Sequence, residues 1–233
     1  MIDSKYTRTT KNIWFPDQKE PLYDPQDEEV MEKFRAYWNE EKRRMREGFY
    51  LADGQVYISG WLYWHTVYWN IAMYIENEKL GKKTRTIKTP YLRDIEWIIA
   101  DDFTRCEKDG KFYSLVGSRD FGKSIIAGSR VGYNYTLFDK SESIVSAGNG
   151  TYIKLATDKV EDGLINLHPV FQKQRIVNDW KREVKAGWKD KKTGITSHLS
   201  SQSSIQIRNF EEGSKTDAAV GARPGFHLID EIG

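Results

Sequence analysis

The sequence predicts an α/β protein in which helices flank a mainly parallel sheet, preceded by a helical extension rich in aromatic residues. Three observations support this prediction. Short apolar runs alternate with helix-forming segments from residue 112 onward, at the spacing of parallel strand–helix–strand units. A glycine-rich loop lies between one apolar run and the helix pattern that follows it. Residues 1–89 instead combine a charged helix pattern with a dense aromatic block, so we expect a domain boundary between residues 89 and 90.

The composition of the 233-residue chain limits the classes of protein to which it can belong. Hydrophobic residues make up 39% and aromatic residues 13%, which is enough to build a core and excludes wholesale disorder. The 36 Lys and Arg residues nearly balance the 34 Asp and Glu residues, so any contact with nucleic acid must use a local patch. The single cysteine, Cys106, excludes an intrachain disulfide framework and fits a reducing, cytoplasmic setting.

The first part of the extension carries a clear helix pattern. Asp27 is placed to cap a helix that ends at Gly48, because acids crowd its first turn and bases crowd its last. The next segment, 56–75, has no charged residue and is long enough to span a bilayer, but it is rich in Trp and Tyr. We therefore expect a buried aromatic layer, helical from Trp61 onward, and no membrane partner.

Two stretches of basic residues have two interpretations each. Five bases between residues 79 and 88 indicate either a solvated loop or a contact to DNA phosphates. Between residues 173 and 192, eight Lys and Arg residues accompany three acids, with Trp180 and Trp188 interleaved. This second stretch indicates either a surface that faces DNA or simply the exposed side of a hairpin or helix.

The second part of the chain, residues 90–233, contains the alternating segments. Helical periodicity runs from Pro90 to Phe103, and further helices are expected from about Lys123 and Tyr152. The apolar runs that predict strands are 111–116, 143–147, 205–207 and 226–229.

The strongest motif lies at residues 117–124, where GSRDFGKS fits the pattern G-x-x-x-x-G-K-[ST]. Glycines at both ends of such a loop let backbone N–H groups turn toward a phosphate, and the helix that follows adds its positive N-terminal end. Lys123 is placed to reach the β- and γ-phosphates of ATP, and Ser124 to ligate Mg²⁺. The residues expected to hold the nucleotide are Gly117, Ser118, Arg119, Asp120, Phe121, Gly122, Lys123 and Ser124.

A pair of acids supplies the second half of the predicted site. The apolar run 226–229 ends in Asp230 and Glu231, which we expect to bind the metal and to polarise the attacking water, respectively. The glutamate directly after the aspartate favours hydrolysis over transfer of a phosphoryl group to a small acceptor. Arg119 either stabilises charge on the γ-phosphate in the transition state or pairs with Asp120 or another nearby acid. The expected catalytic residues are therefore Lys123, Arg119 and Glu231.

These residues resemble the large terminase subunit of tailed phages. SRDFGKS at 118–124 is similar to that family's phosphate loop, and GARPGFHLIDE at 221–231 is similar to the approach to its second motif. Weaker similarities are SIVSAGN at 143–149, YISGWLYW at 57–64 and PYLRDIEW at 90–97. The resemblance implies a P-loop NTPase of the ASCE type, with Tyr91 and Arg93 on the adenine side of the nucleotide.

The family resemblance also implies a function. It implies an ATP-driven, Mg²⁺-dependent motor that threads double-stranded viral DNA through the portal into a procapsid in the host cytoplasm. Its implied partners are double-stranded DNA, the portal protein, the small terminase subunit and further copies of this chain in a ring. The family continues beyond its Asp-Glu strand with a coupling strand and a nuclease domain. We therefore expect residues 1–233 to be the N-terminal part of a longer or split protein, and we assign them no nuclease activity.

Other functions stay open at this point. Another DNA-translocating ATPase, such as a helicase, shares the loop pattern, although helicase loops usually carry small residues where Arg119, Asp120 and Phe121 stand. A small-molecule kinase would need an arginine-bearing lid, which the sequence does not indicate. A nucleotide-binding fragment with little activity of its own is the remaining alternative.

Overall fold

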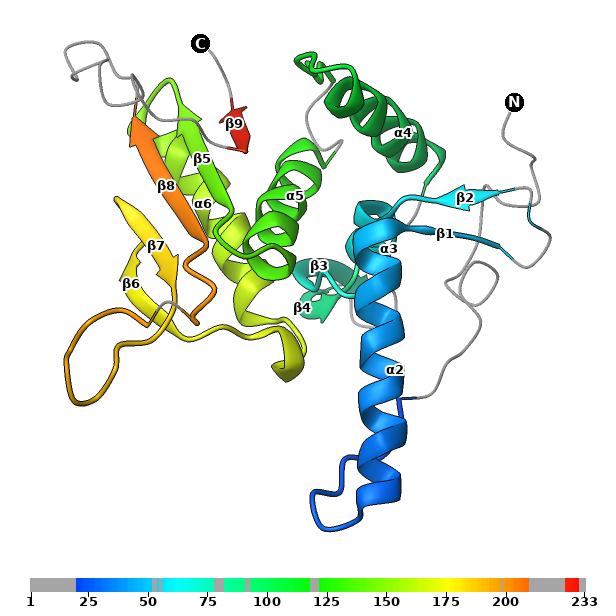
Figure 1. Cartoon of the computed structure of the whole chain (residues 1–233). Coiled ribbons are helices and arrows are strands. Elements are labelled where there is room, and N and C mark those ends of the chain that lie inside the picture. The colour runs from blue at the N-terminus through cyan, green and yellow to red at the C-terminus, as the bar shows by residue number, and fades with distance from the viewer. Residues whose placement is uncertain are drawn as a thin grey trace. The chain divides into compact units, whose positions relative to one another are not determined.

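The computed structural model describes residues 20–51, 54, 56–77, 82–90, 93–117, 122–197, 199–209 and 225–230 (Figure 1). The chain divides into two compact units. The first unit comprises Met1–Tyr68 and Pro90–Val116, and the second comprises Trp69–Thr89 and Gly117–Gly233. This division differs from the expected boundary between residues 89 and 90, because each unit combines two separate stretches of chain.

Helix α2 (Glu28–Glu47) of the first unit matches its predicted bounds and caps. The carboxylate of Asp27 accepts hydrogen bonds from the backbone N–H groups of Glu29 and Val30, which satisfies donors that the first helical turn leaves free. Gly48 ends the helix with a φ of 73°, a left-handed value that glycine adopts without strain.

The aromatic layer of the first unit is buried, as predicted. Helix α3 (Gly60–Val67) buries Trp61 and Trp64 and packs against α2 and against α4 (Asp94–Lys108). The short strands β1 (Phe49–Tyr50) and β2 (Tyr57–Ile58) pair antiparallel between α2 and α3. Within the described residues, none of these helices has the length and apolar run that a membrane span requires.

The first unit also buries a carboxylate, that of Glu41 on α2, which is 1% exposed. Tyr63 donates a hydrogen bond to Glu41 over 2.6 Å, and the Tyr68 hydroxyl donates a second. Burial raises the pKa of both tyrosines, so their hydroxyls keep the protons that they donate. Arg44 adds a hydrogen bond of 3.2 Å, which compensates the negative charge that would otherwise make this burial costly.

The strand predicted at residues 111–116 is not formed, so this prediction was wrong. The segment has no strand pairing, and the side chains of Phe112 and Val116 are exposed to solvent. A strand depends on a neighbour that pairs with its backbone N–H and C=O groups, and an alternating apolar pattern does not supply one. The segment therefore remains an extended connection after α4.

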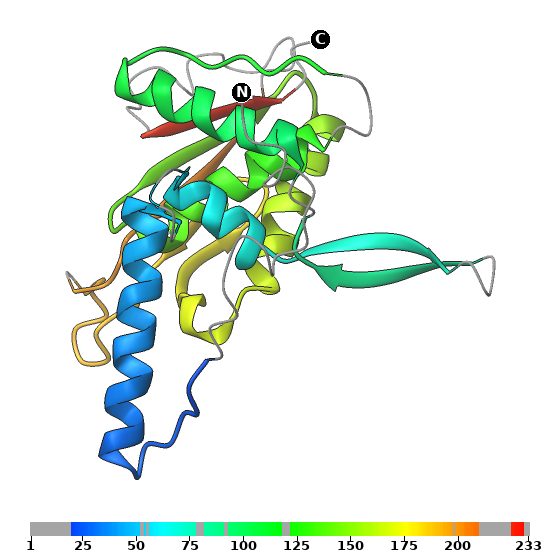
Figure 2. The ribbon, with the colours of Figure 1, turned by 90° about the vertical axis from the view of Figure 1, so that its right-hand side faces the viewer.

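The second unit is built on a sheet with the strand order β6-β7-β8-β5-β9 (Figures 1 and 2). Strand β5 pairs parallel with β8 and β9, whereas β7 pairs antiparallel with β6 and β8. The sheet is therefore mixed, which corrects the prediction of a mainly parallel one. Its strands are β5 (Glu142–Ala147), β6 (Arg175–Asp179), β7 (Glu183–Ala186), β8 (Ser204–Asn209) and β9 (Phe226–Asp230).

Two helices pack against each other and against this sheet. Helix α5 (Lys123–Leu137) starts where it was predicted, and α6 (Gly150–Ile165) starts two residues before the expected position. The carbonyl oxygen of the Asn149 side chain caps α6 by accepting from two backbone N–H groups. Both helices contact β5, whose residues after Glu142 are all buried, so this strand forms the centre of the core. A short 3₁₀ turn, η2 (Pro169–Phe171), follows α6.

The second unit also includes an antiparallel hairpin, β3 (Ile71–Asn77) and β4 (Lys82–Lys88). Figure 2 shows it as a long two-stranded ribbon. Of the two interpretations of the bases between residues 79 and 88, the solvated loop is wrong for residues 82–88, which form β4, and the contact to DNA phosphates stays a prediction. The β-branched residues Thr84, Thr86 and Ile87 favour extended backbone, and the pairing with β3 outweighs the repulsion among the bases.

The indole ring of Trp69 packs tightly between α5 and α6, and we call this packing the Trp69 wedge. A Cβ atom placed on Gly132 of α5 would lie 2.3 Å from Trp69 Cζ3, and one on Gly163 of α6 would lie 2.0 Å from Trp69 Cζ2. Both distances are far below van der Waals contact, so only glycine fits at these two positions. The ring itself is fully buried.

We therefore expect Gly132→Ala and Gly163→Ala each to lower the free energy of unfolding by about 1–3 kcal/mol, the usual cost of overpacking a core. Gly128→Ala on α5 is the matched control, because a Cβ atom at Gly128 would lie 3.6 Å from the nearest atom, Val160 Cγ2. The control should be neutral or stabilising by up to about 1 kcal/mol, because alanine favours helix. Urea unfolding of the three variants measures the difference, and equal effects at all three positions would contradict the wedge.

His65 on α3 is the most strongly shifted histidine of the described residues. It is 2% exposed, and burial lowers its pKa from 6.5 to about 3, with a further contribution from the positive charge of Arg93. The unfolded chain therefore binds a proton between pH 6.5 and pH 3 that the folded chain does not bind.

Because the unfolded state gains protons first, stability should fall as the pH drops below about 6.5. Between pH 7 and pH 5 the contribution of His65 is a loss of about 2 kcal/mol. Denaturant unfolding at the two pH values measures the loss, and His65→Gln serves as the control because it cannot titrate. If the histidine and glutamine proteins lose the same stability between pH 7 and pH 5, the assignment to His65 is refuted.

Candidate functional site

The loop motif leads directly into helix α5, as predicted. Gly122 has φ 89° and ψ 15°, a left-handed conformation that a side chain would strain, and the helix starts at the next residue. The Lys123 ammonium donates a hydrogen bond of 2.7 Å to the carbonyl oxygen of Gly117. The two described ends of the motif are therefore joined by its own lysine.

The serine of the motif meets the predicted metal-binding acid. Ser124 Oγ donates to Asp230 Oδ2 over 3.2 Å, although the two residues are 106 positions apart in the chain. Asp230 is the last residue of β9, and it is held in place because β9 pairs in parallel with the buried strand β5, with Asp230 opposite Ala147. The fold thus joins the two halves of the predicted site.

Within the described residues, the N-terminus of α5 lacks the side-chain cap that the starts of α2 and α6 both have. Its first turn also contains no acid. Helix α2, by contrast, has Asp27 as its cap and two glutamates in its first turn, and α6 has Asn149. An uncapped helix start leaves backbone N–H groups and the positive end of the helix dipole available to an anion.

The donor set at this point fits a magnesium ion bound together with a phosphorylated ligand. Mg²⁺ prefers hard oxygen ligands, and it usually keeps several waters and takes one or two carboxylates plus substrate phosphates. Ser124 and Asp230 offer a hydroxyl and a carboxylate oxygen within 3.2 Å of each other. The described residues contain no cluster of three or more His, Cys, Asp or Glu side chains, so an all-protein metal cage is not present among them.

The remaining predicted site residues are placed as follows. Arg93 is the N-cap of α4 in the first unit, and its guanidinium and backbone N–H both bind the carboxylate of Glu96, with distances of 2.8 and 2.9 Å from Nε and the backbone nitrogen. Its expected role near adenine stays a prediction. Six predicted residues lie outside the described residues, namely Tyr91, Ser118, Arg119, Asp120, Phe121 and Glu231.

One pair near the site was not predicted. His227, three residues before Asp230 on β9, places its Nε2 2.8 Å from Ser146 Oγ on β5. This contact joins the two strands close to the site. Burial lowers the pKa of His227, which favours its neutral ring. His227 was interpreted as a structural residue of the strand, and its contact with Ser146, two positions beyond its register partner Ile144, carries no signal in the sequence alone.

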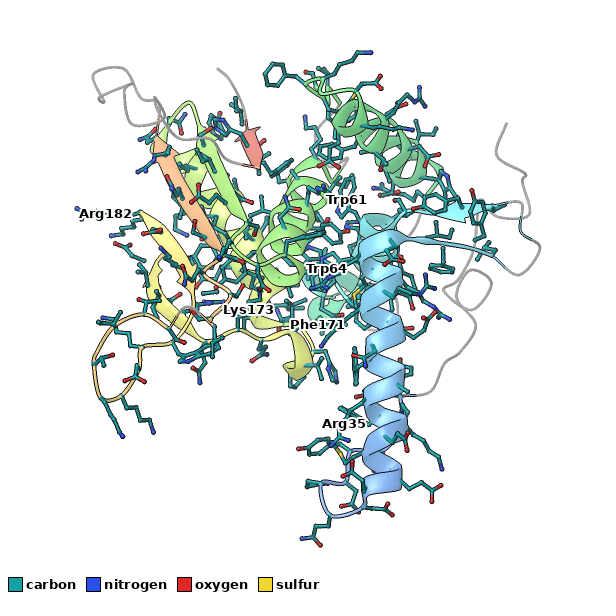
Figure 3. All side chains as sticks on the ribbon, in the orientation of Figure 1. Arg35, Trp61, Trp64, Phe171, Lys173 and Arg182 are labelled. Carbon is teal, nitrogen blue, oxygen red and sulfur yellow. The ribbon has the colours of Figure 1, made fainter. Side chains whose placement is uncertain are left out.

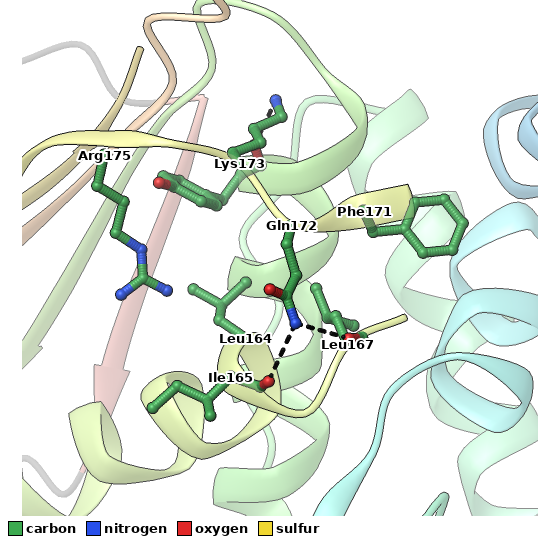
Figure 4. Close-up of a pocket in the computed structure, with 8 residues that line it drawn as sticks. Leu164, Ile165, Leu167, Phe171, Gln172, Lys173 and Arg175 are labelled. Carbon is green, nitrogen blue, oxygen red and sulfur yellow. Dashed lines mark hydrogen bonds between the residues drawn. The ribbon is translucent and has the colours of Figure 1, made fainter. Parts of the chain in front are cut away.

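A cavity of about 350 Å³ lies at the opposite end of α5 (Figure 4). Its lining includes Tyr135, which is eleven positions after Ser124 and therefore about 16 Å away along the helix axis. Gln172 closes one side by donating to the carbonyl oxygens of Ile165 and Leu167. This distance excludes the cavity from the phosphate site.

No family model matches the chain, and no curated protein is similar to it in sequence.

The contact between Ser124 and Asp230 can be tested by a double-mutant cycle. For Ser124→Ala and Asp230→Asn we expect a coupling energy of about 0.5–1.5 kcal/mol in unfolding experiments, the usual net value of a hydrogen bond. The control cycle pairs Ser124→Ala with Asp158→Asn, an exposed residue of α6 bound to Lys154. Its coupling should be close to zero, and a zero coupling in both cycles would show that the contact does not form in solution.

Proposed function

We propose that this chain is the ATP-hydrolysing part of a motor that moves double-stranded DNA, of the kind formed by the large terminase subunit in viral DNA packaging. The observation that carries the proposal is the hydrogen bond between Ser124 and Asp230. A hydroxyl at the start of a helix and a carboxylate at the end of a neighbouring strand are the two protein ligands that a phosphate-loop ATPase provides to Mg²⁺.

Three further features support this proposal. The complete loop motif lies at residues 117–124, Gly122 has the left-handed backbone that the motif needs, and the start of α5 is uncapped. In the proposed mechanism Lys123 leaves the Gly117 carbonyl and pairs with the β- and γ-phosphates. Bound Mg²⁺ would neutralise charge that develops on the phosphates.

The roles of two residues follow from the sequence alone. Glu231 follows Asp230 directly, and in the proposed mechanism it accepts a proton from the attacking water. Arg119 lies inside the loop and stabilises charge on the γ-phosphate. The fold as a P-loop NTPase, the host cytoplasm as location, and a ring with the portal protein and small terminase subunit belong to the same proposal.

A nucleotide-binding protein with little turnover is a second candidate. One observation favours it: within the described residues, the segment 111–116 before the loop is not paired as a strand. A loop anchored on only one side by a packed element holds its phosphate-binding backbone less rigidly, and preorganised groups contribute most of the rate in phosphoryl transfer. Another DNA-translocating ATPase remains an alternative within the first proposal.

A thermal-shift experiment on the full chain tests nucleotide binding. ATP with Mg²⁺ at about 100 times its dissociation constant should raise Tm by roughly 5–10 °C, and Lys123→Ala should abolish the shift. Lys154→Ala is the control, because this lysine lies on α6 and pairs with Asp158. Asp230→Asn should remove most of the extra shift that Mg²⁺ adds to that of ATP alone.

Hydrolysis separates the two candidate functions. The motor proposal expects ATP turnover that Glu231→Gln lowers by at least about 100-fold while the ATP-dependent thermal shift remains. Binding without turnover in the wild-type chain would favour the second candidate. Equal thermal shifts in wild type and Lys123→Ala would exclude both.

A further inference from the structure

The second unit contains two stretches rich in cations, residues 79–88 and residues 173–192. Between residues 173 and 192 the cations exceed the acids by five, although the whole chain carries a net charge of only +2. The rest of the chain is therefore net negative. Six cations of this stretch form what we call the basic strip, namely Lys181, Arg182, Lys185, Lys189, Lys191 and Lys192.

One end of the basic strip lies on a small ordered hairpin, residues 188–197. Ser197 N–H donates to the Trp188 carbonyl, and Asp190 N–H donates to the Ile195 carbonyl, over 2.9 and 2.8 Å. The Asp190 carboxylate accepts from the backbone N–H groups of Lys192 and Thr193, which folds the tip. Backbone geometry therefore holds Lys191 and Lys192 at the exposed tip, and Lys189 on the stem, where it pairs with Thr196.

The other end of the basic strip is the turn between β6 and β7. Lys181 and Arg182 occupy this turn and are exposed, and Figure 3 shows Arg182 extending away from the sheet. Lys185 lies between the two ends on β7, where it alternates with the buried residues Val184 and Ala186. At about 3.3 Å per residue, the seven positions from Arg182 to Lys189 cover at most about 23 Å.

The cations of the basic strip have no ion-pair partner among the described residues. Other exposed cations of the same chain do have partners: Lys33 pairs with Glu29 and Lys154 pairs with Asp158, each over 2.6 Å. Charges that neighbouring carboxylates do not neutralise create a local positive potential, and such a potential attracts polyanions.

We propose that the basic strip is the surface through which this chain holds the backbone of double-stranded DNA. The inference rests on the proposed function, which makes a duplex the expected polyanion. The phosphates of one strand of a duplex rise by about 3.4 Å per base pair along the helix axis, so a strip of at most about 23 Å covers at most about seven base-pair steps. Lysine ammonium groups on an exposed hairpin and strand contact phosphates without reading base edges, which gives binding that is independent of sequence.

Trp188 extends the same surface. Its side chain is 44% exposed and lies next to Lys189 on the hairpin. A large aromatic ring beside cations adds van der Waals contact with the sugars of a strand that the lysines hold by charge. The surface thus combines long-range attraction with a close contact.

The test measures binding of the full chain to a fluorescent 30-base-pair duplex by anisotropy, without nucleotide, at several salt concentrations. The triple variant Lys189→Glu, Lys191→Glu, Lys192→Glu and the double variant Lys181→Glu, Arg182→Glu should each weaken binding at least about 10-fold at low salt. The slope of log K against log salt should become shallower by about 2–3 in the triple variant and by about 2 in the double variant.

The matched control is Lys33→Glu, Lys42→Glu, Lys154→Glu, which changes the net charge equally at exposed positions of α2 and α6. It should change affinity less than about 3-fold, and circular dichroism and Tm should show that all variants fold. If either strip variant binds DNA like wild type, or if the control loses as much affinity as the triple variant, the proposal is overturned.

Two further measurements separate the alternatives. Poly-glutamate that displaces the duplex at equal charge concentration would overturn DNA as the partner and favour an acidic protein. Because the assay contains no nucleotide, strip-dependent DNA binding in a chain that shows no ATP-dependent thermal shift would retain this inference while the ATPase proposal fails. The reverse result, an ATP shift with no strip-dependent DNA binding, would overturn the inference alone.

Discussion

The hydrogen bond between Ser124 and Asp230 is the contact on which the interpretation of this chain depends. It exists because two parallel strands, β5 and β9, end at the same edge of the sheet, and because α5 packs beside them. Neither residue could reach the other if β9 ran antiparallel, since Asp230 would then lie at the opposite edge. The strand direction is therefore the constraint that converts two separate sequence motifs into one site with oxygen ligands on both sides.

The start of α5 adds a second constraint on the same site. A helix start without a cap leaves polar groups unsatisfied, and proteins normally avoid this cost by placing Asp, Asn or Ser there, as α2 and α6 do in this chain. Gly122 also adopts a left-handed backbone where a side chain would be strained. The uncapped N–H groups are a cost in the unliganded protein that a bound anion removes, whereas Gly122 gives the loop its left-handed backbone without strain.

Features with a local cause could be predicted from the sequence, whereas features that depend on distant partners could not. Asp27 is the N-cap of α2 and Gly122 is the N-cap of α5, and in both cases neighbouring residues alone determine where the helix starts. The strand expected at 111–116 failed because its backbone has no pairing partner in the described residues, and the β3–β4 hairpin was missed because pairing outweighed charge. The Trp69 wedge joins glycines 31 positions apart, and no local pattern indicates it.

At the site, the meeting of Ser124 and Asp230 was predicted, whereas Arg119 and Glu231 lie outside the described residues.

The sheet also connects the candidate site with the basic strip inside one compact unit. Asp230 ends β9, Lys185 lies on β7, and only β5 and β8 separate these strands. Three steps between neighbouring strands of about 4.8 Å place the two strands about 14 Å apart across the sheet. Hydrogen-bonded strands with a buried centre transmit a displacement more rigidly than a flexible linker, since packed cores have low compressibility. If the proposed functions of both surfaces hold, a change at the nucleotide phosphates can reach the DNA backbone through β5 and β8, without any movement of one unit against the other.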